Sequence, residues 1–227
     1  MFYYDYYSLI ILFPLMILSL IIQLIMKSTY NKYSKIPNTK GMTGADIARS
    51  ILRSAGIYDI DVQMTSGQLS DHFDPTKKVI KLSNEVFCAN SISAIGVAAH
   101  ETGHALQYAS DYFPMRLRSS IVGITNFSSK LLYFLIILSF VFSIPIICDI
   151  AVICFGVLFF FQVVTLPVEF NASSRAIEQI EALGYESIEI SSVKKVLTAA
   201  AMTYVVAMLY SLGQLATFFL RTRNRRR

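Results

Sequence analysis

The residues with the clearest chemistry form the segment His100-Glu101-Thr102-Gly103-His104, an H-E-x-x-H pattern that uses two of the three histidines in the chain. On an α-helix, residues four apart lie on one face, so both imidazoles can reach one small cation. Glu101 lies about 100° around the helix from His100, where its carboxylate can face a water molecule beside that cation. Two nitrogen ligands and a carboxylate base are what a zinc hydrolase requires. Random placement gives this pattern with a probability on the order of one in a thousand.

The residues around the motif predict that its helix is buried. Ala98 and Ala99 precede the motif, and Ala105 and Leu106 follow it. Buried His and Glu side chains need partners, because an unpaired polar group in an apolar environment is costly. The alternative is a surface helix that carries two His and one Glu by chance. The apolar flanks favour one bound zinc ion per chain.

Zinc held by two histidines needs a third protein ligand. The extended motif with a third histidine is excluded, because Gln107 and Ser110 stand where that motif has Gly and His. A carboxylate or His72 remains, and Glu169 is the strongest candidate. It stands at the end of an apolar run, where a carboxylate is costly unless it is paired or binds a metal. The alternative is an interfacial Glu with no ligand role.

The composition is that of a membrane protein, with 54% hydrophobic residues and a mean hydropathy of +0.52. Charge-free apolar runs cover residues 8–26, 131–147, 151–168 and, less apolar, 198–220. The first is predicted to be a retained anchor, and the second and third a hairpin with its turn at 145–149. The fourth either spans the membrane or packs against the other helices. We therefore expect a mainly α membrane protein with about four transmembrane helices and a small α+β catalytic unit.

The positions of the basic residues predict that the catalytic segments face the cytoplasm and the N-terminus lies outside. Residues 1–7 and the expected hairpin turn carry no Lys or Arg, whereas the membrane ends of the catalytic segments carry Lys27, Lys32, Lys35, Lys40, Arg116, Arg118, Lys130, Arg175, Lys194 and Lys195. The basic tail at 221–227 opposes this topology if the fourth run spans. If that run does not cross, the tail would bind anionic lipid. The net charge of +5 thus reflects topology, and no nucleic-acid partner is expected.

Residues 27–120 carry the signals of a small mixed domain. A helix is expected over 43–55, with Thr43 as its cap and Gly56 as its stop, followed by strands over 57–64 and 78–83. Ser91 or Ser93 is expected to cap the motif helix. The strand over 78–83 either pairs with an extended peptide at the edge of a cleft or belongs to a core hairpin. The domain organisation expected is an anchor at 1–26, this catalytic segment, a membrane hairpin at 121–168, a ligand helix at 169–197 and a membrane helix with its tail at 198–227.

Four segments in a fixed order carry a resemblance to a known family. They are residues 71–75 (DHFDP), 78–83 (KVIKLS), 98–107 (AAHETGHALQ) and 169–173 (EFNAS). Together they resemble the YugP-like neutral zinc metallopeptidases of bacterial membranes and, more distantly, the membrane gluzincins. The H-E-x-x-H pattern alone occurs in many zinc peptidases, whereas the four segments in this order are specific. The resemblance covers nearly the whole chain, from the first apolar run to the fourth.

The resemblance implies a zincin-like catalytic unit with His100, His104 and Glu169 on zinc and Glu101 as the base. Related gluzincins place an acid shortly after the third ligand, where it orients a zinc-bound histidine. Here Asn171 and Ser173 occupy that stretch, and the family pattern has Asp at 171. An Asn accepts a hydrogen bond from an imidazole N–H without a charge, which lowers the basicity of the ligand.

The chemistry expected is hydrolysis of a peptide bond by a zinc-activated water, with Glu101 as general base. The developing oxyanion needs a second donor, for which Arg175 and His72 are the candidates. Arg175 could instead pair with Glu178 or extend to the membrane surface. His72 could instead be an extra ligand or order its turn.

The function predicted is thus a membrane-embedded zinc metallopeptidase in a bacterial cell membrane. Its expected partners are the lipid bilayer and a peptide or protein substrate, membrane proteins included. One alternative is a catalytically silent zinc-binding or sensory membrane protein, which would keep the metal ligands but would not need Glu101. A second is a structural membrane protein with a fortuitous motif. The presence of Glu101 favours the enzyme.

Overall fold

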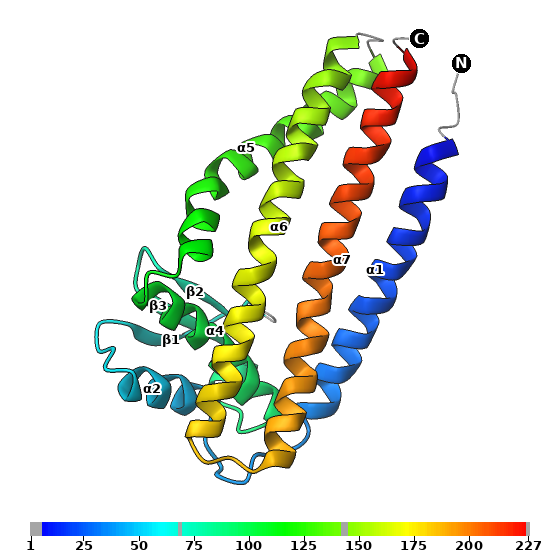
Figure 1. Cartoon of the computed structure of the whole chain (residues 1–227). Coiled ribbons are helices and arrows are strands. Elements are labelled where there is room, and N and C mark those ends of the chain that lie inside the picture. Colours follow the sequence, from blue (N-terminus) through cyan, green and yellow to red (C-terminus); the bar gives the residue numbers. More distant parts are fainter. Residues whose placement is uncertain (1–5, 68–69, 142–144, 226–227) are drawn as a thin grey trace. The chain divides into compact units, whose positions relative to one another are not determined.

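The computed structural model describes residues 6–67, 70–141 and 145–225 of this chain. It is mostly helical, with one small sheet (Figure 1). In chain order, the elements are α1 (Tyr6–Tyr33), α2 (Gly44–Ser54), β1 (Asp61–Thr65), β2 (His72–Asp74), β3 (Val79–Ser83), α3 (Asn84–Phe87), α4 (Ile92–Ala109), α5 (Phe113–Val141), α6 (Pro145–Ala182) and α7 (Ser187–Arg225).

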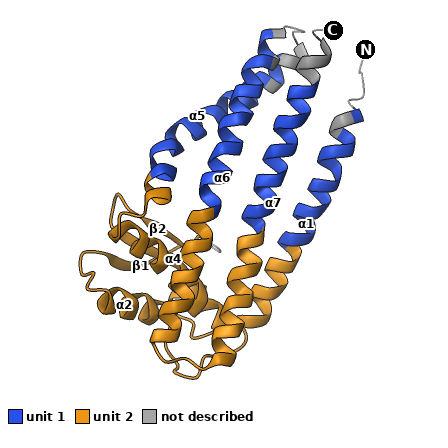
Figure 2. Cartoon of the chain, viewed as in Figure 1, with its two compact units in different colours: residues 1–23, 117–166, 203–227 blue, residues 24–116, 167–202 orange. Residues whose placement is uncertain are grey.

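The chain divides into two compact units (Figure 2). The first, here called the helical unit, comprises the described residues of 1–23, 117–166 and 203–227. The second, here called the mixed unit, comprises those of 24–116 and 167–202 and contains the sheet. Helices α6 and α7 continue without a break across the expected boundaries at 168/169 and 197/198.

The helical unit has the character of a membrane domain. Its core contains buried apolar side chains from α5 and α6, namely Leu132, Leu135, Ile147, Ala151, Cys154 and Phe155. Within the described residues, three helices are long and apolar enough to cross a membrane: Leu9–Tyr33, Asp149–Ala182 and Ser187–Leu220. The expected run at 131–147 includes residues 142–144, which lie outside the described residues, so a count of four spans stays a prediction.

The predicted turn at 145–149 is wrong, because α6 begins at Pro145 and continues through these residues. Proline suits the first position of a helix, since its missing N–H would have no intrahelical partner there and its fixed φ matches the helix. The sequence signal was therefore a helix start and not a turn.

Helix α2 agrees closely with the helix predicted from the sequence over 43–55. Thr43 is the N-cap of α2, and the side chains of Thr43 and Asp46 each accept the other residue's backbone N–H in a capping box. Gly56 follows the C-cap with φ of +71°, a conformation that glycine adopts without steric cost.

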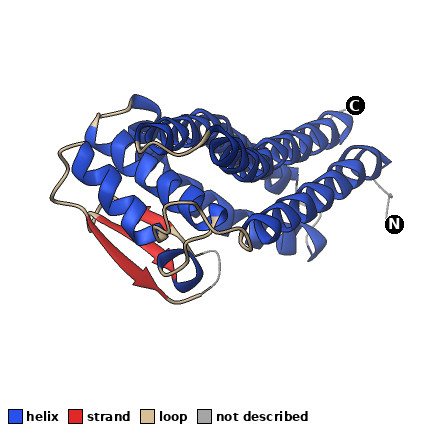
Figure 3. Ribbon diagram, turned by 90° about the horizontal axis from the view of Figure 1, so that it is seen from below, coloured by secondary structure: helices blue, strands red, loops and turns tan. Residues whose placement is uncertain are grey.

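The sheet differs from the expected pair of strands. Its order is β1-β3-β2, with β1 parallel and β2 antiparallel to β3, and Figure 3 shows the strands together on one side of the helices. Because β3 is paired on both sides, it is not an open edge, and of the two interpretations the core hairpin is the one observed. A central strand is covered more fully, and in β3 both Val79 and Ile80 are buried. Strand β1 begins at Asp61, later than expected, and its Met64 is exposed.

Helix α4 is the central element of the mixed unit. Ser91 is its N-cap, and its side chain accepts the N–H of Ala94. Two apolar cores flank the helix: one takes Ile92, Ile95, Ala99 and Leu106 together with residues of α2, α6 and α7, and the other takes Ala94, Ala98 and Ala105 together with the sheet. Burial from two directions fixes the position of the motif that α4 carries.

Candidate metal centre

Two helices bring three ligand side chains together. Helix α4 presents His100 and His104, and α6 presents Glu169, with their ligand atoms all within 4.8 Å of one another. The Glu169 Oε2 atom lies 3.3 Å from His100 Nε2 and 3.6 Å from His104 Nε2. Among the described residues these three form the sole group of His, Cys, Asp and Glu with this geometry. They are the three residues that the sequence suggested as metal ligands.

The two separations between Glu169 and the histidines fit a zinc ion. Zinc binds imidazole nitrogen and carboxylate oxygen at about 2.0–2.2 Å, so two ligands of a tetrahedral ion stand roughly 3.3–3.6 Å apart. Both histidines direct Nε2 toward the carboxylate, and Glu169 is only 2% exposed. A carboxylate this deeply buried requires a cationic or hydrogen-bonding partner. The donor set and its spacing therefore suit a divalent cation.

The other ring nitrogen of each histidine has its own partner. The Nδ1 atom of His100 lies 3.2 Å from Ser173 Oγ, and that of His104 lies 3.0 Å from Gln107 Oε1. An N–H at Nδ1 that donates to these oxygens leaves the Nε2 lone pair for the metal. Ser173 thus lies where the sequence suggested an orienting group.

Gln107 is a site residue that the sequence reasoning missed. Its side chain is fully buried, and its Nε2 donates to Val168 O at 2.8 Å and to Asn171 Oδ1 at 3.0 Å. Asn171 was expected to bond an imidazole directly, but it reaches His104 through Gln107. The available signal was spacing, because a residue three positions after His104 lies on the same helix face.

The electrostatics of the site favour a cation. Burial alone lowers the pKa of His104, but the hydrogen bond that the protonated imidazole donates to Glu169 and the negative charges of Glu101 and Glu169 outweigh burial, so the pKa is raised. The same carboxylates that attract a proton to this imidazole attract a divalent ion. Glu101 is half-buried on α4, next to His100 in the sequence.

Arg175 and His72, the two candidate oxyanion donors, differ in their surroundings. Arg175 Nε donates to Asn171 Oδ1 at 2.9 Å, and its guanidinium group lies 5.9 Å from the centre of the Tyr112 ring. Glu178, the alternative partner of Arg175, accepts a hydrogen bond from Ser174.

The exposed His72 lies on β2, with Nδ1 2.7 Å from the carbonyl oxygen of Ser70, and it is not part of the ligand group. Asp71, next to it, accepts hydrogen bonds from the backbone N–H and the hydroxyl of Ser83. Asp74 accepts the N–H groups of Thr76 and Lys77, as expected for a turn. This segment is therefore built largely by turn and strand contacts.

Comparison with known proteins identifies the family of the chain. Residues 8–223 match the family described as "Putative neutral zinc metallopeptidase". Over 193 residues the chain is 45% identical to the protein of Bacillus subtilis (strain 168) named "Putative membrane protease YugP", an alignment that covers 85% of this chain and 86% of that protein. No solved structure matches. A match that runs through the apolar helices and all three candidate ligands shows that this chain belongs to that family of zinc metallopeptidases.

Proposed function

We propose that this chain is a membrane-embedded zinc metallopeptidase that hydrolyses peptide bonds in protein substrates. The observation that carries the proposal is the convergence of His100, His104 and Glu169 from two helices, with Glu101 adjacent in the motif. A site that only stored zinc would need the three ligands but not the carboxylate at 101. We expect one zinc ion per chain, because the described residues hold one such site.

The residues of the chain have distinct tasks in this chemistry. When bound, zinc supplies a Lewis acid that polarises the scissile carbonyl and acidifies water. His100, His104 and Glu169 would hold the ion, and Ser173 and Gln107 orient the two imidazoles. Glu101 would take a proton from the attacking water and transfer it to the leaving amine.

Arg175 is the better supported donor to the developing oxyanion. Its Nε–H is committed to Asn171, which orients the guanidinium group and leaves the terminal nitrogens to face a substrate. His72 is bonded to Ser70, which favours the alternative that it orders its turn.

The edge strand β2 would hold the substrate. It is an edge of the sheet, and Phe73 packs against Tyr108 of α4 with ring centres 5.7 Å apart. An extended peptide can add to such an edge through main-chain hydrogen bonds. N-methylation of one backbone amide of a cleaved peptide, away from the scissile bond, should then raise KM while leaving kcat little changed.

We place the mixed unit in the cytoplasm of a bacterial cell and expect four membrane spans. Basic residues flank the membrane ends of this unit, which supports that orientation. Cys88 belongs to the mixed unit and is exposed, whereas Cys154 is buried. The experiment uses a Cys148→Ser background, which removes the cysteine near the expected outer end of the hairpin. In this background a membrane-impermeant maleimide should label inside-out vesicles and not intact cells, and Cys88→Ser should abolish the difference. Labelling of Cys88 in intact cells and not in inside-out vesicles would place the mixed unit outside the cell.

The decisive experiment compares the purified, zinc-loaded protein in detergent with Glu101→Gln. The assay follows cleavage of an unfolded protein and of the chain itself, with zinc content measured in parallel. Glu181→Gln removes the same charge from an exposed site on α6 and is the matched control. We expect the parent and Glu181→Gln to cleave, and Glu101→Gln to retain zinc but lose activity by at least about 100-fold.

Two other outcomes would change the conclusion. Equal cleavage by Glu101→Gln and the parent would show a contaminating protease and remove Glu101 as the base. Zinc bound by all three proteins without any cleavage would favour a zinc-binding or sensory role.

A further inference from the structure

A second site lies between two helices of the mixed unit. A pocket of about 680 Å³ is lined by the end of α1 and the beginning of α7. Its lining contains three lysines, Lys32, Lys194 and Lys195, and no acidic residue. Three cationic side chains around one hollow without a carboxylate favour an anionic ligand.

The pocket changes in character along its length. Figure 1 shows α1 and α7 running side by side in opposite directions. At one end of the pocket, Ile25 of α1 and Ala199 and Met202 of α7 contribute apolar walls. At the other end are the lysines, with hydroxyl groups from residues 28, 29, 191 and 198 along the lining. A ligand that fits both ends has an anionic group and an apolar chain.

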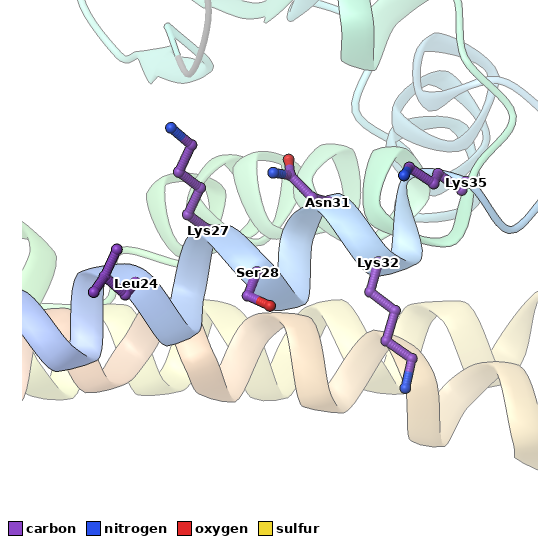
Figure 4. A pocket seen from close by; sticks show the side chains of 6 residues that line it. All are labelled: Leu24, Lys27, Ser28, Asn31, Lys32 and Lys35. Atoms are coloured by element: carbon purple, nitrogen blue, oxygen red, sulfur yellow. The ribbon is translucent and has the colours of Figure 1, made fainter.

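The neighbouring surface of α1 adds to the positive charge. A second hollow of about 560 Å³ shares Ser28 and Lys32 with the first and also takes Lys27 and Lys35. In Figure 4, Lys27 and Lys32 extend from opposite sides of α1, and Lys35 follows just after the helix ends at Tyr33. The end of this helix is therefore cationic on two sides.

The position of the pocket relates it to the membrane. The charge-free run of α1 ends at Met26, and Lys27 is the first basic residue of the chain. On α7, Lys194 and Lys195 come shortly before the apolar run at 198–220. Both helices are candidate spans, so the lysines of both stand where apolar surface gives way to polar surface.

We propose that this pocket binds the phosphate group of an anionic phospholipid, with the lysines on the phosphate and the apolar walls against an acyl chain. Ammonium groups bind phosphate through charge-assisted hydrogen bonds, and nearby hydroxyls can donate as well. A zwitterionic lipid would bring its own cation toward Lys194 and Lys195, so an anionic headgroup is favoured. A soluble anion can carry the same phosphate group as a lipid. The apolar end of the pocket is the feature that favours a lipid, because it can contact an acyl chain.

Titration of the zinc-loaded protein in detergent tests this site. The ligands are short-chain phosphatidylglycerol, phosphatidylcholine of the same chain length and inorganic phosphate, and calorimetry measures each Kd. We compare the parent with Lys32→Gln/Lys194→Gln/Lys195→Gln. Arg53→Gln/Lys77→Gln/Lys81→Gln removes the same charge from positions outside the pocket and serves as the control.

Phosphatidylglycerol should bind the parent and the control more tightly than either other ligand. A lysine near an anionic membrane surface contributes about fivefold in affinity, so the triple variant should lose on the order of 100-fold and Lys194→Gln alone about fivefold. Zinc content should be unchanged in all variants, which separates this result from any failure of the metal site.

Three results would overturn the proposal. Equal affinity for inorganic phosphate would assign the pocket to a soluble anion. Equal affinity for phosphatidylcholine would show that the lysines do not select the headgroup. An equal loss of affinity for phosphatidylglycerol in the triple variant and in its control would show that net charge alone explains the loss.

Discussion

The backbone of Gly103 lies directly against the backbone of Ala172. A Cβ atom at position 103 would lie 2.5 Å from the carbonyl oxygen of Ala172 and 3.1 Å from its carbonyl carbon. Gly103 precedes His104 on α4, and Ala172 lies on α6, three residues after Glu169. The closeness of the two helices at this point is what brings a carboxylate from α6 to the histidines of α4.

Gly103→Ala should therefore disrupt the metal centre. The clash is with backbone, which cannot rotate away, so α6 must shift at a cost of about 1–3 kcal/mol in the free energy of unfolding. We expect a lower melting temperature and a zinc content below one per chain. Gly123→Ala is the control, because a Cβ at that helical position would meet nothing within 4 Å. A Gly103→Ala protein with full zinc content would show that the helix spacing does not set the site.

Gln107→Leu tests the orientation of His104. Leucine has nearly the same volume, but it removes the acceptor for His104 Nδ1 and the donor to Val168 and Asn171. Loss of such an orienting group typically weakens metal affinity by about 10–100-fold. Competition with a chromogenic chelator measures the affinity. Gln179→Leu, half-buried on α6, should bind zinc as the parent does. Unchanged affinity in Gln107→Leu would remove Gln107 from the metal centre.

Removal of zinc should destabilise the parent protein. A ligand that binds only the folded state contributes about 2.7 kcal/mol when its free concentration is 100 times Kd. A chelator should therefore lower the melting temperature, and added zinc should restore it. In Glu169→Gln the carboxylate ligand is absent, so the shift on chelation should be much smaller. Equal shifts in both proteins would indicate that Glu169 does not bind the ion.

Tyr185 gives a prediction at alkaline pH. Its side chain is 6% exposed, and burial, followed by the charges of Glu189 and Asp46, raises its pKa to about 12. An unfolded tyrosine ionises near pH 10, so its contribution to stability is complete below that pH and is lost as the pH approaches 12. Between pH 10 and 12 the free energy of unfolding should fall by on the order of 1 kcal/mol per pH unit from this group.

Tyr185→Phe cannot ionise at this position, so its melting temperature should fall less steeply than that of the parent between pH 10 and 12. The variant also loses the hydrogen bond from Tyr185 to Asn38, which should lower stability by a constant amount below pH 10. Parallel pH profiles for the two proteins would show that Tyr185 ionises normally.

The sequence by itself predicted the features that depend on local spacing and composition. The turn of a helix places His100 and His104 on one face, the Thr43 capping box begins α2, and long charge-free runs predict membrane helices. The sequence also indicated Glu169 as a candidate ligand, because a carboxylate at the end of an apolar run is costly unless it is paired or binds a metal. These features require knowledge of only a few neighbouring residues.

Only the tertiary structure decided how distant segments meet. The parallel pairing of β1 with β3 and the antiparallel pairing of β2 on the other side of β3 could not be read from local patterns. Gln107 gained its role only when α6 supplied Val168 and Asn171 as partners. Strand order and buried polar contacts depend on which surfaces exclude water from each other, and that is fixed by the packing of the whole chain and not by the spacing within one segment.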